Sequence, residues 1–190
     1  MSFIGFVMKG FDFVFKRFPN YQSAPWMDVI GLKKGQLLLA QGQVLANLFW
    51  IESGILREYH QDGEGEFTNS FIFEGNYYLT GFYFGSHLRS SFTVEALEDC
   101  KIISFSMGFF QERDLDHQLV LDVFKEISML KYQYNLQWKL INGKKLFLEK
   151  WESFKQAYPG LWIRIPQKHL ATYFNVSPQY LSKLKTERKL

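Results

Sequence analysis

Residues Ile165–Leu190 read IPQKHLATYFNVSPQYLSKLKTERKL, and this pattern is typical of two short helices joined by a sharp corner. Pro166 suits the first turn of a helix, where its missing N–H has no partner to lose. Ser177 followed by Pro178 is an N-cap with a first-turn proline, which predicts the start of a second helix. Because only Asn175–Val176 separate the helices, the stretch predicts a helix-turn-helix.

Three positions in this stretch agree with a helix-turn-helix. The first helix needs a small residue where the second helix crosses it, and Ala171 is at that place. The corner needs a residue that tolerates positive φ, and Asn175 is the most tolerant type after glycine. Leu181 supplies the buried aliphatic side chain six residues later. An ordinary helical hairpin shares this hydrophobic pattern, so the choice between the two depends on charge.

Positive charge is concentrated in the same stretch. Residues 164–190 hold six lysines and arginines against one acid, Glu187, which gives a net charge of +5. Residues 1–163 hold sixteen basic and eighteen acidic residues, a net charge of −2. Basic charge gathered on a helix-turn-helix is the electrostatic pattern of DNA-binding proteins. We therefore favour DNA binding over the hairpin alternative.

Composition bounds the remaining possibilities. The 190 residues are 47% hydrophobic and 18% aromatic, which predicts a sizeable core and argues against disorder. The one cysteine, Cys100, excludes an internal disulfide framework and is expected to be a small buried residue. Residues 1–18 predict an amphipathic helix docked on the body rather than a signal peptide, with a membrane-surface anchor as the minor alternative. No run is long enough to span a membrane, and we expect a cytoplasmic location.

Short apolar or alternating runs, separated by glycines, follow between about Gly31 and Phe105. Such spacing predicts antiparallel strands in a sandwich, barrel or roll. The predicted strands are Gln36–Ala40, Leu48–Glu52, Ile55–Tyr59, Glu66–Phe73, Tyr77–Phe84, Phe92–Leu97 and Lys101–Phe105.

A long helix without Gly or Pro is predicted over Asp116–Ile141, after a short helix at Phe109–Phe110. Its apolar residues are spaced alternately three and four apart, which is a heptad pattern typical of two helices packed along their length. No second long helix is evident in the chain, so a homodimer is expected; packing on the chain's own strands is the alternative. The predicted seam comprises Val120, Val123, Ile127, Leu130, Tyr134, Gln137 and Ile141.

Asn142–Gly143 ends this helix, and a further helix is predicted over Lys144–Tyr158. An extended segment, Leu161–Ile165, is predicted before the helix-turn-helix. The expected fold class is α+β with three parts: a β-roll with the N-terminal helix (1–115), a long dimerisation helix (116–142) and a DNA-binding domain (143–190).

This order resembles the Crp/Fnr family of bacterial transcription regulators over the whole chain, and two stretches resemble its divergent Bacteroidetes-type branch. The resemblance implies a jelly-roll of the cyclic-nucleotide-binding kind, a C-terminal winged-helix-like helix-turn-helix, and a homodimer that binds double-stranded DNA. RNA polymerase is a further candidate partner. The matching stretches are Lys33–Gly35, Gln41–Gly42, Ile51–Tyr59, Glu95–Cys100, Ile165–Ala171 and Ser177–Lys183.

The resemblance also implies roles for residues of the helix-turn-helix. Pro178, Gln179 and Lys183 occupy the positions that read bases in the family, and Gln favours adenine over guanine. The other expected DNA contacts are to phosphates, which position the protein without specifying sequence. They are Lys168, Ser177, Tyr180, Ser182 and Lys185.

For the roll, the resemblance implies an effector site near Gly81, Arg89, Ser90 and, on the long helix, Tyr134. Arg89-Ser90 match the family's Arg-Ser pair, and a guanidinium suits a phosphate. The segment Tyr77–Gly81 has no carboxylate for a ribose hydroxyl, a loss of roughly 1–3 kcal/mol per missing contact. Cyclic AMP is therefore disfavoured, other cyclic nucleotides or small anions stay open, and no cofactor is expected. A solvated loop arginine is an equal alternative for Arg89.

Two further hypotheses remain beside an effector-sensing regulator. A regulator that has lost effector binding would respond to a partner or to its own abundance, and the missing carboxylate favours it. A cupin-like enzyme would need converging histidines and a carboxylate on one metal. The histidines are scattered through the sequence, each is expected at a surface or helix cap, and no catalytic or metal-ligating residue is proposed. They are His60, His87, His117 and His169.

Overall fold

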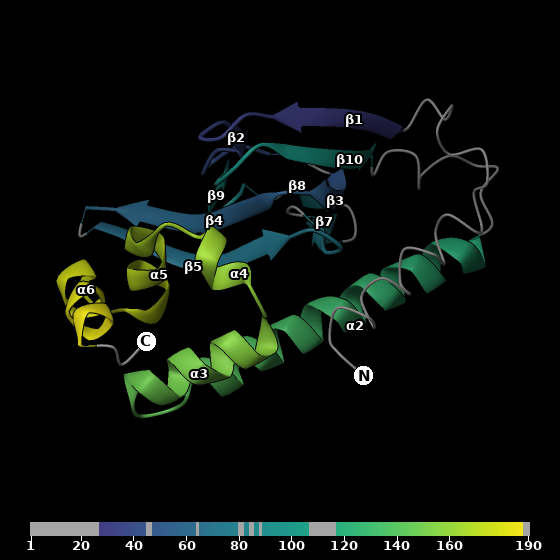
Figure 1. Cartoon of the computed structure of the whole chain (residues 1–190). Helices are drawn as coiled ribbons and strands as arrows, with labels where there is room; N and C mark the ends of the chain where they lie inside the picture. Colours follow the sequence, from purple (N-terminus) through teal and green to yellow (C-terminus); the bar gives the residue numbers. More distant parts are fainter. Residues whose placement is uncertain are drawn as a thin grey trace.

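The structure is a computed structural model that describes residues 27–44, 47–63, 65–79, 82–83, 86–87, 89–106 and 117–187. Within these residues, ten strands are followed by five helices, so the chain is α+β as predicted (Figure 1). The helices predicted at residues 1–18 and at Phe109–Phe110 lie outside the described residues.

Eight strands form two antiparallel sheets, and β7 and β8 pair with each other. The strand order is β1-β10-β3-β6 in one sheet and β2-β9-β4-β5 in the other. The glycine-separated runs predicted most of these strands, whereas β1 and β8 were not predicted. The bounds are β1 Met27–Leu32, β2 Leu37–Leu39, β3 Asn47–Ser53, β4 Ile55–Asp62, β5 Gly65–Phe73, β6 Tyr77–Leu79, β7 Phe82–Tyr83, β8 Ser86–His87, β9 Thr93–Ala96 and β10 Cys100–Ser106.

Apolar side chains between the sheets form the core of the roll. Phe49, Ile51 and Leu56 are among its fully buried members. Cys100 belongs to this core, as its isolation in the sequence predicted. Gly54 lies beside it with φ of 97°, and a Cβ there would lie 2.5 Å from the Cys100 sulfur. Only glycine fits this turn between β3 and β4.

Helix α2 (His117–Asn142) runs along the open side of the roll. There β6 and β5 are the edge strands of the two sheets and would otherwise present unpaired backbone groups. The Tyr134 hydroxyl donates a hydrogen bond to the Phe71 carbonyl oxygen of β5 at 3.1 Å. The helix thus covers the open side of the roll, where the edge strands β5 and β6 of the two sheets separate.

In the C-terminal half of α2, residues of the predicted apolar stripe pack against the roll of the same chain. Tyr134 packs against the core shared with the roll, and Ile141 is buried in it. For these two residues the structure therefore agrees with the alternative, packing on the chain's own roll. The side chains of Val120, Val123 and Ile127 lie outside the described part of the chain. A second apolar stripe is exposed, comprising Leu121, Met129, Tyr132, Leu136 and Leu140.

Four short helices follow α2: α3 (Phe147–Ala157), α4 (Leu161–Arg164), α5 (Gln167–Phe174) and α6 (Pro178–Thr186). Helix α4 replaces the extended segment predicted there. Gly160 has a left-handed conformation with φ of 79°, which lets the chain turn directly from α3 into a new helical turn. That turn buries Leu161 and Ile165, four residues apart, on one side.

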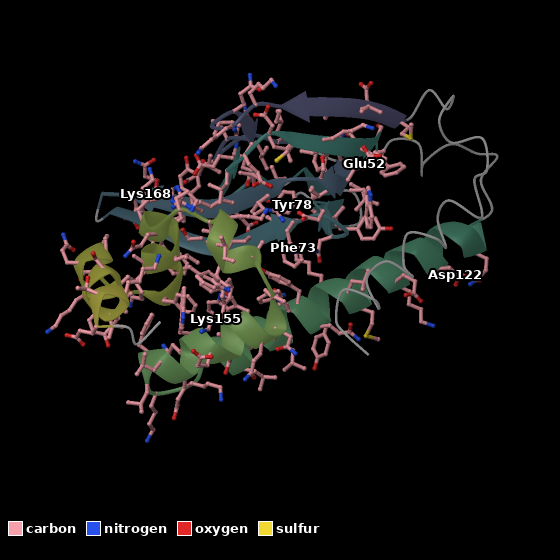
Figure 2. The ribbon with its side chains drawn as sticks, in the orientation of Figure 1. Glu52, Phe73, Tyr78, Asp122, Lys155 and Lys168 are labelled. Carbon is pink, nitrogen blue, oxygen red and sulfur yellow. The ribbon has the colours of Figure 1, made fainter. Side chains whose placement is uncertain are left out.

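One hydrophobic core joins the roll, α2 and the C-terminal helices. It contains Phe71 and Phe73 from β5, Ile141 from α2, and Trp151 and Phe154 from α3. The side chains fill the space between the β4–β5 ribbon and α2 and α3, with Phe73 labelled there (Figure 2). The helix-turn-helix is therefore packed on its own roll.

Candidate nucleic-acid interface and effector cavity

Helices α5 and α6 form the predicted helix-turn-helix. The Ser177 hydroxyl accepts a hydrogen bond from the Tyr180 backbone N–H at 3.1 Å, and Pro178 occupies the first turn. Asn175 has φ of 54° and ψ of 50°, the left-handed conformation expected at the corner. Ala171 and Leu181 are buried where the two helices meet. All of these local features were predicted from the sequence and are confirmed.

The outer face of α6 carries polar and basic side chains. Lys183 is 73% exposed, and its ammonium is 3.9 Å from the Glu187 carboxylate. Tyr180 is partly covered because its ring packs edge-on against Phe147, with centroids 5.4 Å apart. Lys168 is exposed on α5, beside the β4–β5 ribbon (Figure 2). The predicted DNA contacts that are exposed on these helices are Lys168, Ser177, Pro178, Gln179, Tyr180, Ser182, Lys183 and Lys185.

Arg164 holds the helix-turn-helix to the roll instead of adding to its outer charge. Its guanidinium forms ion pairs with Glu74, after β5, and with Glu98, between β9 and β10. These carboxylates together raise the pKa of the arginine, although burial opposes the effect. One of the six basic residues counted in the sequence is therefore neutralised by the roll.

Arg57 forms a second, buried attachment between the roll and the helix-turn-helix. Its side chain is 1% exposed; it pairs with Glu95 at 2.9 Å and with Glu66. Its Nε donates to the Thr68 hydroxyl at 2.8 Å, and that hydroxyl is 2.6 Å from the hydroxyl of Thr172 on α5. The sequence signal was an arginine within the apolar run of β4, but nothing in the sequence identified its partners.

His169 lies at the same attachment and is buried, which corrects the expectation of a surface or cap residue. Its ring nitrogens are 3.9 Å from Glu66 and 4.0 Å from Glu95. Burial lowers the pKa of His169 to about 4, helped by the positive charges of Arg57 and Lys168 and opposed by Glu66. The imidazole is therefore neutral near pH 7.

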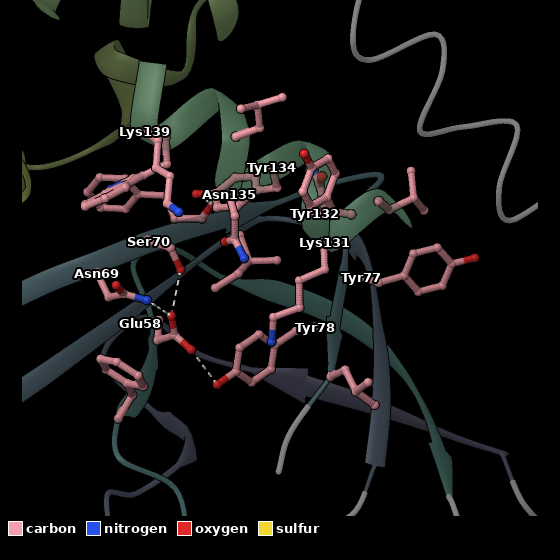
Figure 3. A pocket seen from close by; sticks show the side chains of 18 residues that line it. Glu58, Asn69, Ser70, Tyr77, Tyr78, Lys131, Tyr132, Tyr134, Asn135 and Lys139 are labelled. Atoms are coloured by element: carbon pink, nitrogen blue, oxygen red, sulfur yellow. Dashed lines mark hydrogen bonds between the residues drawn. The ribbon is translucent and has the colours of Figure 1, made fainter. Parts of the chain in front are cut away.

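A cavity of about 580 Å³ lies where the sheets part, under α2 (Figure 3). Glu58 projects into it from β4 and accepts hydrogen bonds from the Tyr78 hydroxyl at 2.9 Å, the Ser70 hydroxyl at 2.9 Å and the Asn69 amide. Burial and the Glu58 charge raise the pKa of Tyr78, so its phenol stays protonated as the donor. The lining residues are Glu58, Asn69, Ser70, Phe71, Ile72, Asn76, Tyr77, Tyr78, Leu79, Phe92, Leu130, Lys131, Tyr132, Tyr134, Asn135, Leu136, Trp138 and Lys139.

Asn69 is an extra residue in β5. The register pairs Glu58 with Ser70 and Tyr59 with Thr68, which leaves Asn69 without a partner in β4. This irregularity is a β-bulge, a feature that redirects side chains locally. The Asn69 amide and the Ser70 hydroxyl both reach Glu58 from the bulge, and the preceding residue, Thr68, reaches Thr172 of α5.

The predicted effector residues do not all come together. Tyr134 lines the cavity, whereas Arg89 and Ser90 do not. The Arg89 guanidinium donates to the Gly42 carbonyl oxygen at 2.9 Å, and the Ser90 hydroxyl donates to the Phe92 carbonyl oxygen at 2.7 Å. Gly81 lies outside the described residues. The sequence missed Glu58 and the lysines of α2, because only the fold brings them to one space.

Comparison with known proteins agrees with the fold. Residues 29–113 match the family model of the cyclic nucleotide-binding domain. Among curated proteins, none matches the sequence. Similar solved structures include FixK2 from Bradyrhizobium japonicum, with 13% identity over 85% of each chain and a TM-score of 0.65. The c-di-GMP responsive global regulator CLP from Xanthomonas campestris is 11% identical over 86% of this chain and 87% of that chain, with a TM-score of 0.67.

A third similar structure is TTHA1359, a Crp/Fnr-family transcriptional regulator from Thermus thermophilus, with 14% identity, 84% coverage of both chains and a TM-score of 0.61. At these identities the likeness shows the fold alone. Residues 29–113 are thus similar to cyclic nucleotide-binding domains. Over 84% of its length, the chain has a fold similar to that of a Crp/Fnr transcriptional regulator.

Metal-binding clusters and membrane-crossing helices are both absent from the described residues. No cluster of three or more His, Cys, Asp or Glu side chains in this part of the chain could hold a metal ion. None of the helices described has the length and apolar character needed to cross a membrane.

Proposed function

We propose that this protein is a homodimeric, DNA-binding transcription regulator of the Crp/Fnr type, with a small effector bound in the cavity between roll and α2. The observation that carries the proposal is the exposed, capped helix α6. Pro178 and Gln179 in its first turn are exposed, and so is Lys183 farther along the helix. A helix presented in this way suits the major groove, with its N-terminal residues at the base edges.

Each of the predicted DNA-contacting side chains has a role in this proposal. Pro178, Gln179 and Lys183 lie at the base edges. The remaining exposed residues contact phosphates and set the position of the helix on the duplex. These are Lys168, Ser177, Tyr180, Ser182 and Lys185.

The exposed apolar stripe of α2 supports the dimer. It includes Met129, Leu136 and Leu140, and Leu140 is 59% exposed. Apolar side chains repeated along a 26-residue helix are expected to bury themselves against an equivalent helix, in an arrangement with twofold symmetry. Two copies joined in this way carry two α6 helices, as a palindromic operator requires.

The test begins with selection of bound duplexes from a random-sequence pool, followed by affinity measurements across salt concentrations. We expect Lys183→Ala to weaken binding by about 1–3 kcal/mol and, if it loses a base contact, to relax preference at one position of the site. Lys34→Ala is the matched control, because Lys34 is exposed on a turn of the roll. No selected sequence, or equal losses in both variants, would contradict the proposal.

One observation favours the second candidate, a regulator that has lost effector binding and responds to a partner or to its own abundance. Arg89, the expected partner of a cyclic phosphate, is bonded to the backbone of Gly42 and lies outside the cavity lining. Titration of the purified protein with cyclic AMP and cyclic GMP tests this candidate. A saturable rise in melting temperature with either nucleotide would contradict it.

A further inference from the structure

The cavity under α2 has two chemically different walls (Figure 3). The roll contributes a carboxylate, Glu58. Helix α2 contributes the ammonium groups of Lys131 and Lys139, within about two turns of each other. If the cavity is the effector site of the proposed function, these walls restrict what it accepts.

The Glu58 wall accepts hydrogen bonds. An ionised carboxylate offers about four acceptor positions, and the Tyr78, Ser70 and Asn69 side chains use three of them. A fourth donor from a ligand can be added, or it can replace the Tyr78 hydroxyl. A ligand group that is itself an acceptor would be repelled.

The α2 wall donates hydrogen bonds. The indole N–H of Trp138 is buried and has no acceptor among the described residues. A buried donor without a partner is unfavourable, and a ligand acceptor that reached the Trp138 N–H would remove that cost. Lys131 and Lys139 add positive charge to the same wall. Between the two walls, the rings of Tyr77, Tyr78 and Phe92 provide flat apolar surface.

We infer that the cavity binds a small molecule with an aromatic body, a hydrogen-bond donor at the end facing Glu58, and an anionic group at the end facing Lys131, Lys139 and Trp138. A molecule with only one of these ends leaves one wall unsatisfied. At a typical value for a charge-assisted hydrogen bond, each correct end contributes roughly tenfold or more in affinity.

Two sets of probes of different length test this inference by calorimetry and thermal shift. The short set is 3-(4-hydroxyphenyl)propionate, 3-phenylpropionate, which lacks the hydroxyl donor, and 4-ethylphenol, which lacks the carboxylate. The long set is adenosine 5′-monophosphate, adenosine, which lacks the phosphate, and purine riboside 5′-monophosphate, which lacks the amino group. In at least one set, the two-ended probe should bind about tenfold more tightly than both relatives.

Variants then assign each end to its wall. Glu58→Gln should abolish the gain in affinity that the donor group gives. The double variant Lys131→Gln/Lys139→Gln should abolish the gain in affinity that the anionic group gives. The matched control, Lys144→Gln/Lys145→Gln, removes two exposed lysines beyond the end of α2 and should change neither. Circular dichroism of each variant without a probe confirms that it is folded.

Three outcomes overturn the inference: no saturable binding in either set, one-ended probes that bind as tightly as two-ended ones, or Glu58 and lysine variants that behave like the control. These measurements use no DNA, so they stand apart from the operator selection. Two-ended binding by a protein without DNA affinity would overturn the proposed function and leave the ligand class intact.

Discussion

Replacing Arg57 by Met removes the buried attachment between the roll and α5 while keeping most of the apolar stem. The change deletes hydrogen bonds to Thr68 and Glu95 and the ion pair with Glu66. Losing one member of a buried ion pair costs about 3–5 kcal/mol when the other stays buried. Here the side chains of Glu66 and Glu95 are 39% and 19% exposed, so water partly replaces the arginine. We expect a loss of about 2–3 kcal/mol in the free energy of unfolding.

Urea denaturation measures the loss, and amide hydrogen exchange locates it. Exchange should accelerate in β5 and α5, because Thr68 loses a donor and its contact with Thr172 is weakened. Lys101→Met is the matched control: it breaks an exposed pair with Glu52 and should cost about 1 kcal/mol or less. Two results would contradict this role of Arg57: a loss in the free energy of unfolding no larger than that of the control, or unchanged protection of the α5 amides from exchange.

Three further predictions address the dimer, the acid sensitivity and the corner. Leu136→Glu, on the exposed stripe of α2, should give a monomer by light scattering, whereas Ile163→Glu, exposed on α4, should leave the dimer intact. His169 has a pKa lowered to about 4 in the folded chain and about 6.5 when unfolded, so below pH 6.5 the unfolded chain binds the extra proton. As the pH is lowered from 6.5 to 4, the free energy of unfolding should therefore fall by up to about 1.4 kcal/mol per pH unit. In urea titrations His169→Gln should flatten this slope, and an unchanged slope would contradict the lowered pKa of His169. Asn175→Val should cost about 1–2 kcal/mol, because a β-branched residue resists the left-handed conformation, while Asn175→Gly should be close to neutral. Equal melting temperatures for the two corner variants would contradict the last expectation.

The helix-turn-helix was predictable because its signals are local. The N-cap at Ser177, the left-handed corner at Asn175 and the buried small residue at Ala171 all follow from neighbouring residues. Most strands of the roll were predicted for the same reason, since turns marked by glycine separate them.

The attachment to the roll was not predictable, because its partners are far apart in the chain. Thr68 and Thr172 are separated by 104 positions, and Arg164 is 90 positions from Glu74. A heptad pattern likewise predicts that a helix has an apolar face, but it does not indicate which part of the protein covers that face. Tyr134 and Ile141 are covered by the chain itself, and the stripe through Leu136 is left exposed.

The bulge at Asn69 gives strand β5 two neighbours at consecutive residues. Thr68 contacts α5, the first helix of the helix-turn-helix, while Asn69 and Ser70 hold the Glu58 carboxylate inside the cavity. In the proposed regulator, an effector that draws Glu58 away from those donors would loosen strand β5, on which α5 is packed. Adjacent residues, Thr68 and Asn69, would then couple the proposed effector site to the helix-turn-helix, without movement at the Asn142–Gly143 junction.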